Sequence, residues 1–435
     1  MKNVTKLTSI YLSLFLSTTV IGSILLYLPV TGKKAISLID AFFIATSAFT
    51  VTGLSTVDIP NQFNLLGQII ILLLIQIGGL GIITLSIFAL ILSRRKITFN
   101  ERNLLMLSWN SNENSSLLKL TIQIVTFSII VEIIGFLFLS LVFIPDYGIL
   151  QGAFISLFTS ISAFNNAGFS LFSDSLMSYS NNIVINIVVP ALIILGGVGY
   201  IVILDIAMTR KLVKLKLHTK IVLSSTIVLI TIGTIAFWLL EYQHLLKGSE
   251  WYEQLLKSFF QSVTTRTAGF NTVDISQISN PTLLLFLVLM FIGAAPMSSA
   301  GGIKVTTFTI ILVYIYSKIK GIEHPRLFKK SIVKEQIDKT ILVFVLAIFI
   351  IFISTFLITF LNPDIEFIKV FFEVVSAFGT VGLSTGITAD LSIISKVIII
   401  CIMIIGKIGL FILLSIFQTP KVSSSYYYVK EKVQL

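Results

Sequence analysis

Charged side chains are scarce in this chain. Asp, Glu, Lys and Arg make up 12% of its 435 residues, hydrophobic residues make up 55%, and the mean hydropathy is +0.99. Soluble domains carry about 25% charged residues, so a soluble domain is excluded. Apolar stretches of about 20 residues, enough to cross a hydrocarbon core of roughly 30 Å, occur about eight times. The composition predicts an all-α membrane protein with eight spanning helices.

Cysteine and histidine, the usual residues of disulfide and metal sites, are also rare. Cys401 is the single cysteine and lies in an apolar stretch, which excludes a disulfide framework. His218, His244 and His324 fall in different predicted loops and form no ligand cluster. A membrane-embedded enzyme would need a nucleophile and base or metal ligands inside the spans, and no histidine falls there. We therefore predict no enzyme activity, no catalytic residues and no resident metal.

A short segment centred on a glycine occurs four times in the chain. The copies are residues 47–55 (SAFTVTGLS), 162–170 (SAFNNAGFS), 265–271 (TRTAGFN) and 376–384 (SAFGTVGLS). Their central glycines are 115, 101 and 113 residues apart. A period of that size fits a pair of membrane helices with an insertion between them. We therefore predict four pseudo-symmetric units around one central axis.

Each unit is predicted to contain a spanning helix, a short helix that cannot cross the membrane, the glycine segment and a second spanning helix. The predicted units cover residues 1–93, 94–210, 211–318 and 319–417, followed by a C-terminal tail at 418–435. The predicted second helices cover residues 65–92, 182–208, 283–316 and 391–417. The first two contain GGLG and GGVG at equivalent positions, which favours close helix packing.

Basic residues are distributed unevenly between the two sides of the predicted membrane domain, within a net charge of +11. The loops between units carry Arg94, Arg95, Lys96, Arg102, Arg210, Lys211, Lys214, Lys216, Lys220, Lys318, Lys320, Arg326, Lys329, Lys330, Lys334 and Lys339. The other side carries Lys33, Lys34, Lys247, Lys257, Arg266, Lys369 and Lys396. This positive-inside pattern predicts that both termini are cytoplasmic. It also disfavours the alternative of a basic surface that binds nucleic acid.

The four glycine segments have the properties of a cation filter. Non-helical backbone at membrane depth must be buried in protein or line water, because an unsatisfied amide costs several kcal/mol in lipid. Four such segments meet this condition if their carbonyls face one axis, and glycine permits the backbone angles that this requires. Rings of carbonyl oxygens replace the water shell of a potassium-sized cation. The carbonyl end of each short helix also favours a cation there. The alternative, a glycine in a turn or at a helix contact, explains one copy more readily than four.

Three charged residues lie close to these segments. Asp58 and Asp274 follow two of them and are expected at the outer mouth, where carboxylates concentrate cations. Capping of the next turn is an equally good interpretation of both. Arg266 precedes Gly269 by three residues and would repel cations if it faced the axis. We therefore expect Arg266 behind the filter, paired with an acid such as Glu373.

The predicted second helix of the third unit is interrupted by small residues and a proline. A flexible segment below the filter would obstruct the path, so we predict a gating loop there; a plain kink is the alternative. No strand precedes the Gly-Gly-Ile-Lys at 301–304, so it is not a phosphate-binding loop. The predicted gating residues are Gly293, Ala294, Ala295, Pro296, Met297, Ser298, Ser299, Ala300, Gly301, Gly302 and Lys304.

Lys407 and Glu132 are ionisable residues inside predicted spans. A lysine in a span costs about 2.5–3.5 kcal/mol on insertion scales, so Lys407 should face a cavity or a partner. There it would set a charge barrier below the filter, whereas snorkelling to the membrane surface is the alternative. The same reasoning applies to Glu132, whose placement is less defined.

The four units, their glycine segments, the Arg-Thr-Ala-Gly-Phe-Asn sequence at 266–271 and the interrupted helix together resemble the Trk/Ktr/HKT superfamily of potassium transporters. The resemblance covers nearly the whole chain and is strongest to the bacterial Ktr membrane subunits (KtrB or KtrD type). It implies a potassium-selective subunit of an uptake system in the bacterial cell membrane, through which ions move down their electrochemical gradient. The resemblance does not decide whether transport depends on sodium. It also leaves the alternative that this chain is a member of the superfamily that conducts sodium or mixed cations.

The resemblance also implies site residues and partners. The implied filter is Thr50, Val51, Thr52, Gly53, Asn165, Asn166, Ala167, Gly168, Arg266, Thr267, Ala268, Gly269, Gly379, Thr380, Val381 and Gly382. Glycine at all four central positions is associated with potassium in the family. Relatives commonly have arginine where this chain has Lys407. Lysine keeps the positive charge but lacks the planar guanidinium group that can form two parallel hydrogen bonds. The implied assembly is a homodimer among membrane lipids, with a cytoplasmic nucleotide-binding RCK-type ring (KtrA or KtrC type). K⁺ is the bound and transported ion, Na⁺ is an open second one, and no covalent cofactor or nucleic acid is implied.

Overall fold

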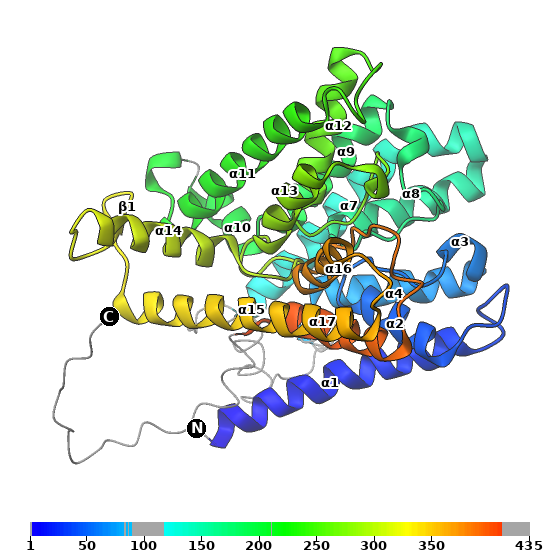
Figure 1. The fold of residues 1–435 in the computed structure, drawn as a ribbon, viewed down its shortest axis with the longest axis horizontal. Helices are drawn as coiled ribbons and strands as arrows, with labels where there is room; N and C mark the ends of the chain where they lie inside the picture. Colours follow the sequence, from blue (N-terminus) through cyan, green and yellow to red (C-terminus); the bar gives the residue numbers. More distant parts are fainter. Residues whose placement is uncertain (1, 82–83, 86, 89–116, 210, 411–435) are drawn as a thin grey trace.

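The computed structural model describes residues 2–81, 84–85, 87–88, 117–209 and 211–410 (Figure 1). Helices dominate these residues, which confirms the predicted all-α class, and one two-residue hairpin pairs Arg326 with Ser331. In chain order the elements are α1 (Lys2–Tyr27), α2 (Leu38–Phe49), α3 (Ile59–Gln62), α4 (Leu65–Leu80), α7 (Leu117–Tyr147), α8 (Ile149–Phe164), η1 (Met177–Tyr179), α9 (Ile183–Gly197), α10 (Tyr200–Thr209), η2 (Leu212–Lys214), α11 (Leu217–Glu241), α12 (Trp251–Thr264), η3 (Ile275–Gln277), α13 (Asn280–Phe291), α14 (Val305–Ile319), β1 (Arg326–Leu327), β2 (Lys330–Ser331), α15 (Lys334–Leu361), α16 (Phe367–Gly379) and α17 (Ile393–Ile408).

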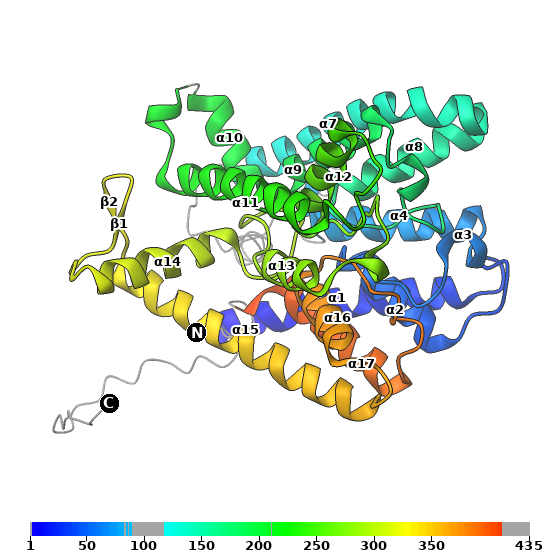
Figure 2. The same ribbon diagram turned by 45° about the horizontal axis from the view of Figure 1, so that its top comes forward.

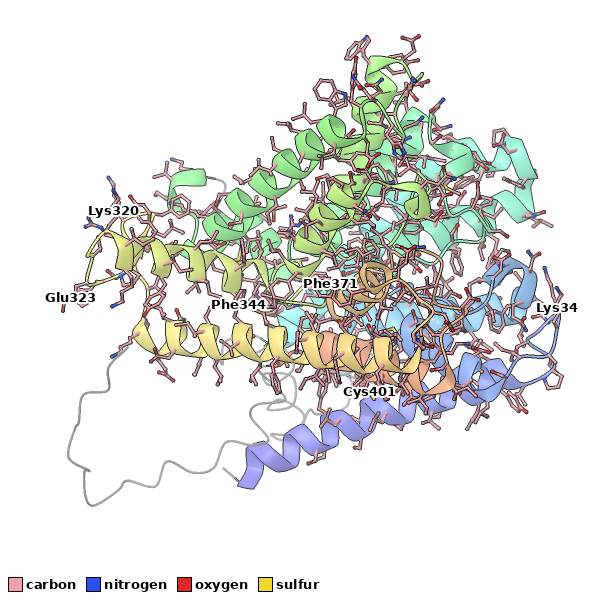
Figure 3. All side chains as sticks on the ribbon, viewed as in Figure 1. Lys34, Lys320, Glu323, Phe344, Phe371 and Cys401 are labelled. Carbon is pink, nitrogen blue, oxygen red and sulfur yellow. The ribbon has the colours of Figure 1, made fainter. Side chains whose placement is uncertain are left out.

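Four times the described chain runs through a long helix, a short helix, a non-helical segment and a second helical stretch. The long helices α1, α7, α11 and α15 contain the continuous stretches that are long and apolar enough to cross a membrane. The short helices α2, α8, α12 and α16 have only 12 to 16 residues. Figures 1 and 2 show α1, α11 and α15 running in the same direction along the long axis. Figure 3 shows Lys34 at one end of that axis and Lys320 and Glu323 at the other.

Neighbouring units are joined by a repeated helix contact. The second helix of one unit packs against the short helix of the next, with α4 against α8, α9 against α12 and α13 against α16. The cycle closes because α17 of the fourth unit packs against α2 of the first. An ion pair between Lys396 Nζ on α17 and Asp40 Oδ1 on α2, at 3.0 Å, stabilises the closing contact. The four short helices therefore surround one centre.

The second helical stretch of every unit is interrupted, whereas the sequence predicted an interruption in the third unit alone. The helix α4 ends directly before Gly81 and α17 directly before Gly409, and these glycines have φ angles of 85° and 84°. In the second unit, α9 and α10 are separated at Gly199, which has φ 90°, and the two helices bend by 92°. A positive φ ends a right-handed helix, so these glycines act as break points.

The continuous second helices predicted over residues 65–92, 182–208 and 391–417 are therefore wrong. Among the described residues, four continuous helices and the bent pair of α9 and α10 are long and apolar enough to span a membrane. The eight predicted spans are thus not all present as single helices. The basic cluster predicted at 94–102, the unit boundary at 93/94 and the tail at 418–435 lie outside the described residues.

Polar side chains join the end of a long helix to the start of the second helical stretch. The buried carboxylate of Glu241, the last residue of α11, accepts hydrogen bonds at Oε1 from Ser279 N (3.0 Å), Ser279 Oγ (2.7 Å) and Thr282 Oγ1 (2.5 Å). In the fourth unit, Asn362 Oδ1 beyond α15 accepts from Ser392 N at 3.0 Å. These acceptors satisfy backbone N–H groups that have no partner within the following helix.

Glu241→Ala should destabilise the folded protein, because it removes the acceptor of Ser279 N and of the Ser279 and Thr282 hydroxyls, which then keep only the bond between the two hydroxyls at 2.9 Å. We expect a loss of about 1–3 kcal/mol, seen as a lower thermal unfolding midpoint of the detergent-purified protein. Glu250→Ala is the control, because Glu250 is exposed and makes no side-chain cap bond to α12. Equal midpoints for the two variants would contradict the role given to Glu241.

Candidate functional site

The four glycine segments adopt one backbone conformation directly after the short helices. The residue two positions before each central glycine has a positive φ: 51° at Val51, 57° at Asn166, 74° at Thr267 and 50° at Thr380. The glycines themselves have φ angles of 94° at Gly53, 69° at Gly168, 79° at Gly269 and 90° at Gly382. Three of these residues, Val51, Thr267 and Thr380, are β-branched, and β-branched residues are rarely left-handed because that conformation strains them. The positive φ recurs at the same position of all four segments, which indicates that the surroundings impose it.

The turn into each segment is closed by a backbone hydrogen bond. In three segments the N–H of the residue before the glycine donates to a carbonyl five residues earlier, at 2.8 Å: Thr52 to Ser47, Ala167 to Ser162 and Val381 to Ser376. In the third segment Ala268 N donates to Thr264 O, only four residues earlier, at 3.0 Å. That turn is one residue shorter, and its sequence is also the one that departs most from the other three.

The four central glycines lie against one another in cyclic order, and we call them the ring glycines. A Cβ built on Gly53 would lie 2.5 Å from Ala167 O, on Gly168 2.6 Å from Ala268 O, on Gly269 2.5 Å from Val381 O, and on Gly382 2.1 Å from Thr52 O. Each contact reaches the next unit, and the last returns to the first. The four segments therefore surround one axis, and only glycine fits at these positions.

A cavity of about 600 Å³ opens beside the ring glycines, and both Asp58 and Asp274 line it. Asp58 accepts hydrogen bonds at Oδ2 from Asn61 Nδ2 (2.5 Å) and Ser173 Oγ (2.6 Å). Asp274 accepts at Oδ1 from Ser276 N at 2.9 Å, and so caps the turn that follows it. Asp274 therefore lines the cavity and also caps a turn, so the two interpretations do not exclude each other for this residue.

Arg266 lies behind its segment, but it does not pair with Glu373. The Arg266 side chain is 6% exposed and lines a cavity of about 20 Å³ with Ile193, Gly197 and Thr226, and its Nε makes no hydrogen bond. Glu373 accepts instead from the Thr388 hydroxyl of its own unit. The expected ion pair is therefore wrong. The last turn of α9 lines the same cavity as Arg266, and a helix dipole favours a positive charge near its carbonyl end.

The non-helical residues 292–304, which we call the intramembrane loop, pass directly beside the ring. Gly301 N donates to Thr380 Oγ1 of the fourth segment at 2.9 Å, and a Cβ on Gly301 would lie 2.5 Å from the same oxygen. On the other side, Ser299 N donates to Gly196 O of the second unit at 3.4 Å. The loop therefore bridges the second and fourth units next to the glycine segments.

More of the predicted loop residues contact the broken helix of the second unit. Ala295 N donates to Gly197 O at 3.0 Å, and Tyr200 N at the start of α10 donates to Met297 O at 3.1 Å. Met297 itself has φ 56°. The break between α9 and α10 thus leaves backbone groups that the intramembrane loop satisfies.

Two lysines hold adjacent carbonyls of the intramembrane loop. Lys407 Nζ on α17 donates to Ser299 O, and Lys304 Nζ donates to Ala300 O at 2.6 Å. The Lys407 ammonium group is therefore bound to a backbone carbonyl of the same chain, in the interior of the protein. Gln76, which was not predicted, lies in a comparable interior position and contacts Glu132. Gln76 follows an apolar run at 69–75 and precedes Gly79 by three residues, and this isolated amide was the sequence signal for it.

Comparisons with known proteins agree with one another. The model of a family described as TrkH, cation transport protein, matches residues 3–425. Ktr system potassium uptake protein B of Bacillus subtilis is 42% identical, over 91% of this chain and 89% of that protein. Potassium/sodium uptake protein NtpJ of Enterococcus hirae is 38% identical, over 95% and 94%. The crystal structure of the potassium transporter TrkH from Vibrio parahaemolyticus matches with a TM-score of 0.75 at 20% identity, over 95% of this chain and 85% of that one. That match shows a shared fold.

Gly382→Ala should destabilise the protein more than Gly386→Ala, although the two glycines have φ angles of 90° and 94°. Alanine is strained at both positions, but only at Gly382 would its Cβ meet another segment, 2.1 Å from Thr52 O, whereas nothing lies within 4 Å at Gly386. We expect a further loss of about 1–3 kcal/mol from overpacking at Gly382. Thermal unfolding of both purified variants measures the difference, and equal midpoints would argue against the close ring.

Proposed function

Because this chain belongs to the TrkH family of cation transport proteins, we propose that it is the potassium-translocating membrane subunit of a Ktr-type uptake system. The closed ring of glycines carries this proposal. Four segments of similar conformation meet at one axis, and each glycine allows the carbonyl of the neighbouring segment to approach. A carbonyl-lined passage of this kind replaces the hydration shell of K⁺.

In the proposed mechanism, ions enter from the cavity that Asp58 and Asp274 line and pass through the filter residues 50–53, 165–168, 266–269 and 379–382. The carboxylates raise the local cation concentration at the entrance. The carbonyl ends of α2, α8, α12 and α16 favour a cation at the ring. Movement through the ring follows the electrochemical gradient and needs no covalent step.

The intramembrane loop is the proposed gate. It lies beside the fourth filter segment through the bond from Gly301 N to Thr380 Oγ1. Lys407 and Lys304 hold its carbonyls, so two positive charges stand close to the path of a cation. Displacement of the loop would have to break these bonds. The loop and its lysines therefore oppose conduction until another input favours the open state.

The relatives named as parts of Ktr systems support a partner subunit. We propose a homodimer in the bacterial cell membrane whose gate responds to a cytoplasmic, nucleotide-binding RCK-type ring, with the basic loops and both termini on the cytoplasmic side. The relative from Enterococcus hirae is named a potassium/sodium uptake protein. That name supports a second candidate function, in which this chain conducts sodium as well as potassium or depends on it.

Ion flux into liposomes tests the proposed function. The unchanged chain should take up K⁺ in strong preference to Na⁺, and Gly53→Ser should lower this preference because a side chain enters the space beside Ala167 O. Gly148→Ser is the control, since Gly148 also has a positive φ but nothing lies within 4 Å of its built Cβ. Absence of K⁺ uptake by the unchanged chain would refute the proposal, and equal K⁺ and Na⁺ uptake would favour the second candidate.

Lys407→Gln should increase K⁺ flux, because it removes a charge and a charge-assisted bond that hold the intramembrane loop. A bond of that kind is worth about 1.5–3 kcal/mol, which corresponds to about a tenfold or larger shift of the closed–open equilibrium. Lys407→Arg keeps the charge and should stay close to the unchanged chain. Initial uptake rates at equal protein density measure the effect. An unchanged rate in Lys407→Gln would contradict the proposed role of Lys407 in gating.

A further inference from the structure

Three polar side chains from three helical elements form one hydrogen-bonded group behind the second filter segment, which we call the Glu132 cluster. Gln76 on α4 donates Nε2 to both carboxylate oxygens of Glu132 on α7, at 3.0 and 3.1 Å. Asn165, the first residue after α8, donates Nδ2 to Gln76 Oε1 at 2.8 Å and to Glu132 Oε1 at 3.2 Å. Glu132 is 6% exposed and Asn165 is fully buried. The cluster therefore lies in the protein interior.

Asn165 connects this cluster directly to the filter. It lies three residues before Gly168, and its Nδ2 also donates to Ile161 O in the last turn of α8, at 2.9 Å. Its Oδ1 makes no hydrogen bond and faces Gly79, where a built Cβ would lie 1.9 Å away. The side chain is thus clamped between α4 and α8, and it cannot turn without breaking several contacts.

The chemistry of the cluster fixes the direction of every hydrogen bond in it. An ionised carboxylate only accepts, so Glu132 forces Gln76 to present its NH₂ group. Gln76 then presents its oxygen to Asn165, which must present its own NH₂ group in turn. The described residues include no ion pair to Glu132, so these amides are the groups that would stabilise an ionised carboxylate there. Bonds to a carboxylate are stronger than neutral ones, which makes the arrangement stiff.

The residue three positions before the ring glycine differs in each unit. It is Thr50, Asn165, Arg266 or Gly379, and of these only Asn165 is held by side chains of two other helices. Thr50 bonds within its own unit, to Thr46 O at 2.8 Å and Thr52 Oγ1 at 2.7 Å. The second segment therefore has a support that the other segments do not share.

We propose that Glu132 and Gln76 are positioning residues for the second filter segment, so that discrimination between K⁺ and Na⁺ depends on the carboxylate at position 132. This inference rests on the proposed function. Selectivity depends on where the carbonyl oxygens stand, and such sites tolerate displacements of only about 0.5 Å. The Glu132 cluster holds the segment from behind, at the residue where it leaves α8. A role confined to joining α4, α7 and α8 would alter the amount of folded protein but not the ion ratio.

The test compares K⁺ and Na⁺ uptake by full-length protein in liposomes. Glu132→Gln should lower the K⁺/Na⁺ uptake ratio about tenfold, the factor that corresponds to one charge-assisted hydrogen bond, because glutamine at 132 cannot orient Gln76 and Asn165 together. The double variant Gln76→Glu/Glu132→Gln moves the carboxylate to the other side of the same pair. It can still accept from Asn165 and from the new amide, so the ratio should return toward that of the unchanged chain.

Glu241→Gln is the matched control. It neutralises another buried carboxylate, at the junction of α11 and α13, and should leave the K⁺/Na⁺ ratio unchanged. If Glu132→Gln accumulates poorly in the membrane, Gln76→Met removes the bond to Asn165 from the α4 side and should lower the ratio in the same way.

The outcomes separate this inference from the function on which it rests. A lower ratio in Glu132→Gln or Gln76→Met, with recovery in the double variant and no change in Glu241→Gln, supports the positioning role. Selective K⁺ uptake with the same ratio in the cluster variants overturns the positioning role alone. An unchanged chain that takes up no K⁺ overturns the proposed function and this inference together.

Discussion

Backbone polar groups at membrane depth must find partners, and this constraint shapes the whole molecule. Lipid offers none, so a segment that leaves its helix there must lie against other protein or line water. Four segments do so together at one axis. Their common left-handed turn and the mutual contact of the ring glycines bring carbonyls of adjacent units within van der Waals distance of each other's backbone. The long helices and their contacts surround and support this centre.

The same constraint accounts for the glycines of the second helices. A Cβ on Gly78 would lie 1.8 Å from Phe49 O, and one on Gly196 would lie 1.8 Å from Phe164 O. Glycine thus lets the second helix press against the carbonyl end of the short helix. A few residues later another glycine, such as Gly199, ends the helix. The groups that this break exposes are satisfied by the intramembrane loop, which places the loop next to the glycine segments.

The backbone of the site is nearly four-fold, but the side chains that support it are not. The second segment is held by the Glu132 cluster, the third places a buried arginine behind it, and the fourth bonds to the intramembrane loop through Thr380. The four segments therefore have equivalent geometry and different mechanical connections. In the proposed function, the first property suits an ion that is coordinated on all sides. The second lets a gate act on one segment without displacing the other three.

The sequence by itself determined the membrane class, the four glycine segments, the short helices that precede them and the interruption after α13. These features depend on composition and on local signals: apolar runs, a motif repeated in the same context, and proline among small residues. The short helix α12, for example, ends at Thr264, directly before the third glycine segment, as the sequence predicted for the short helix of each unit. Only the tertiary structure decided that Gly81, Gly199 and Gly409 break their helices, and that Glu373 bonds within its own unit. A glycine is compatible with helix and break alike, and a buried charge accepts any neighbour of suitable chemistry. Contacts between residues far apart in the chain determine both the helix breaks and the partner of the buried charge. Hydropathy and motif spacing do not report such contacts.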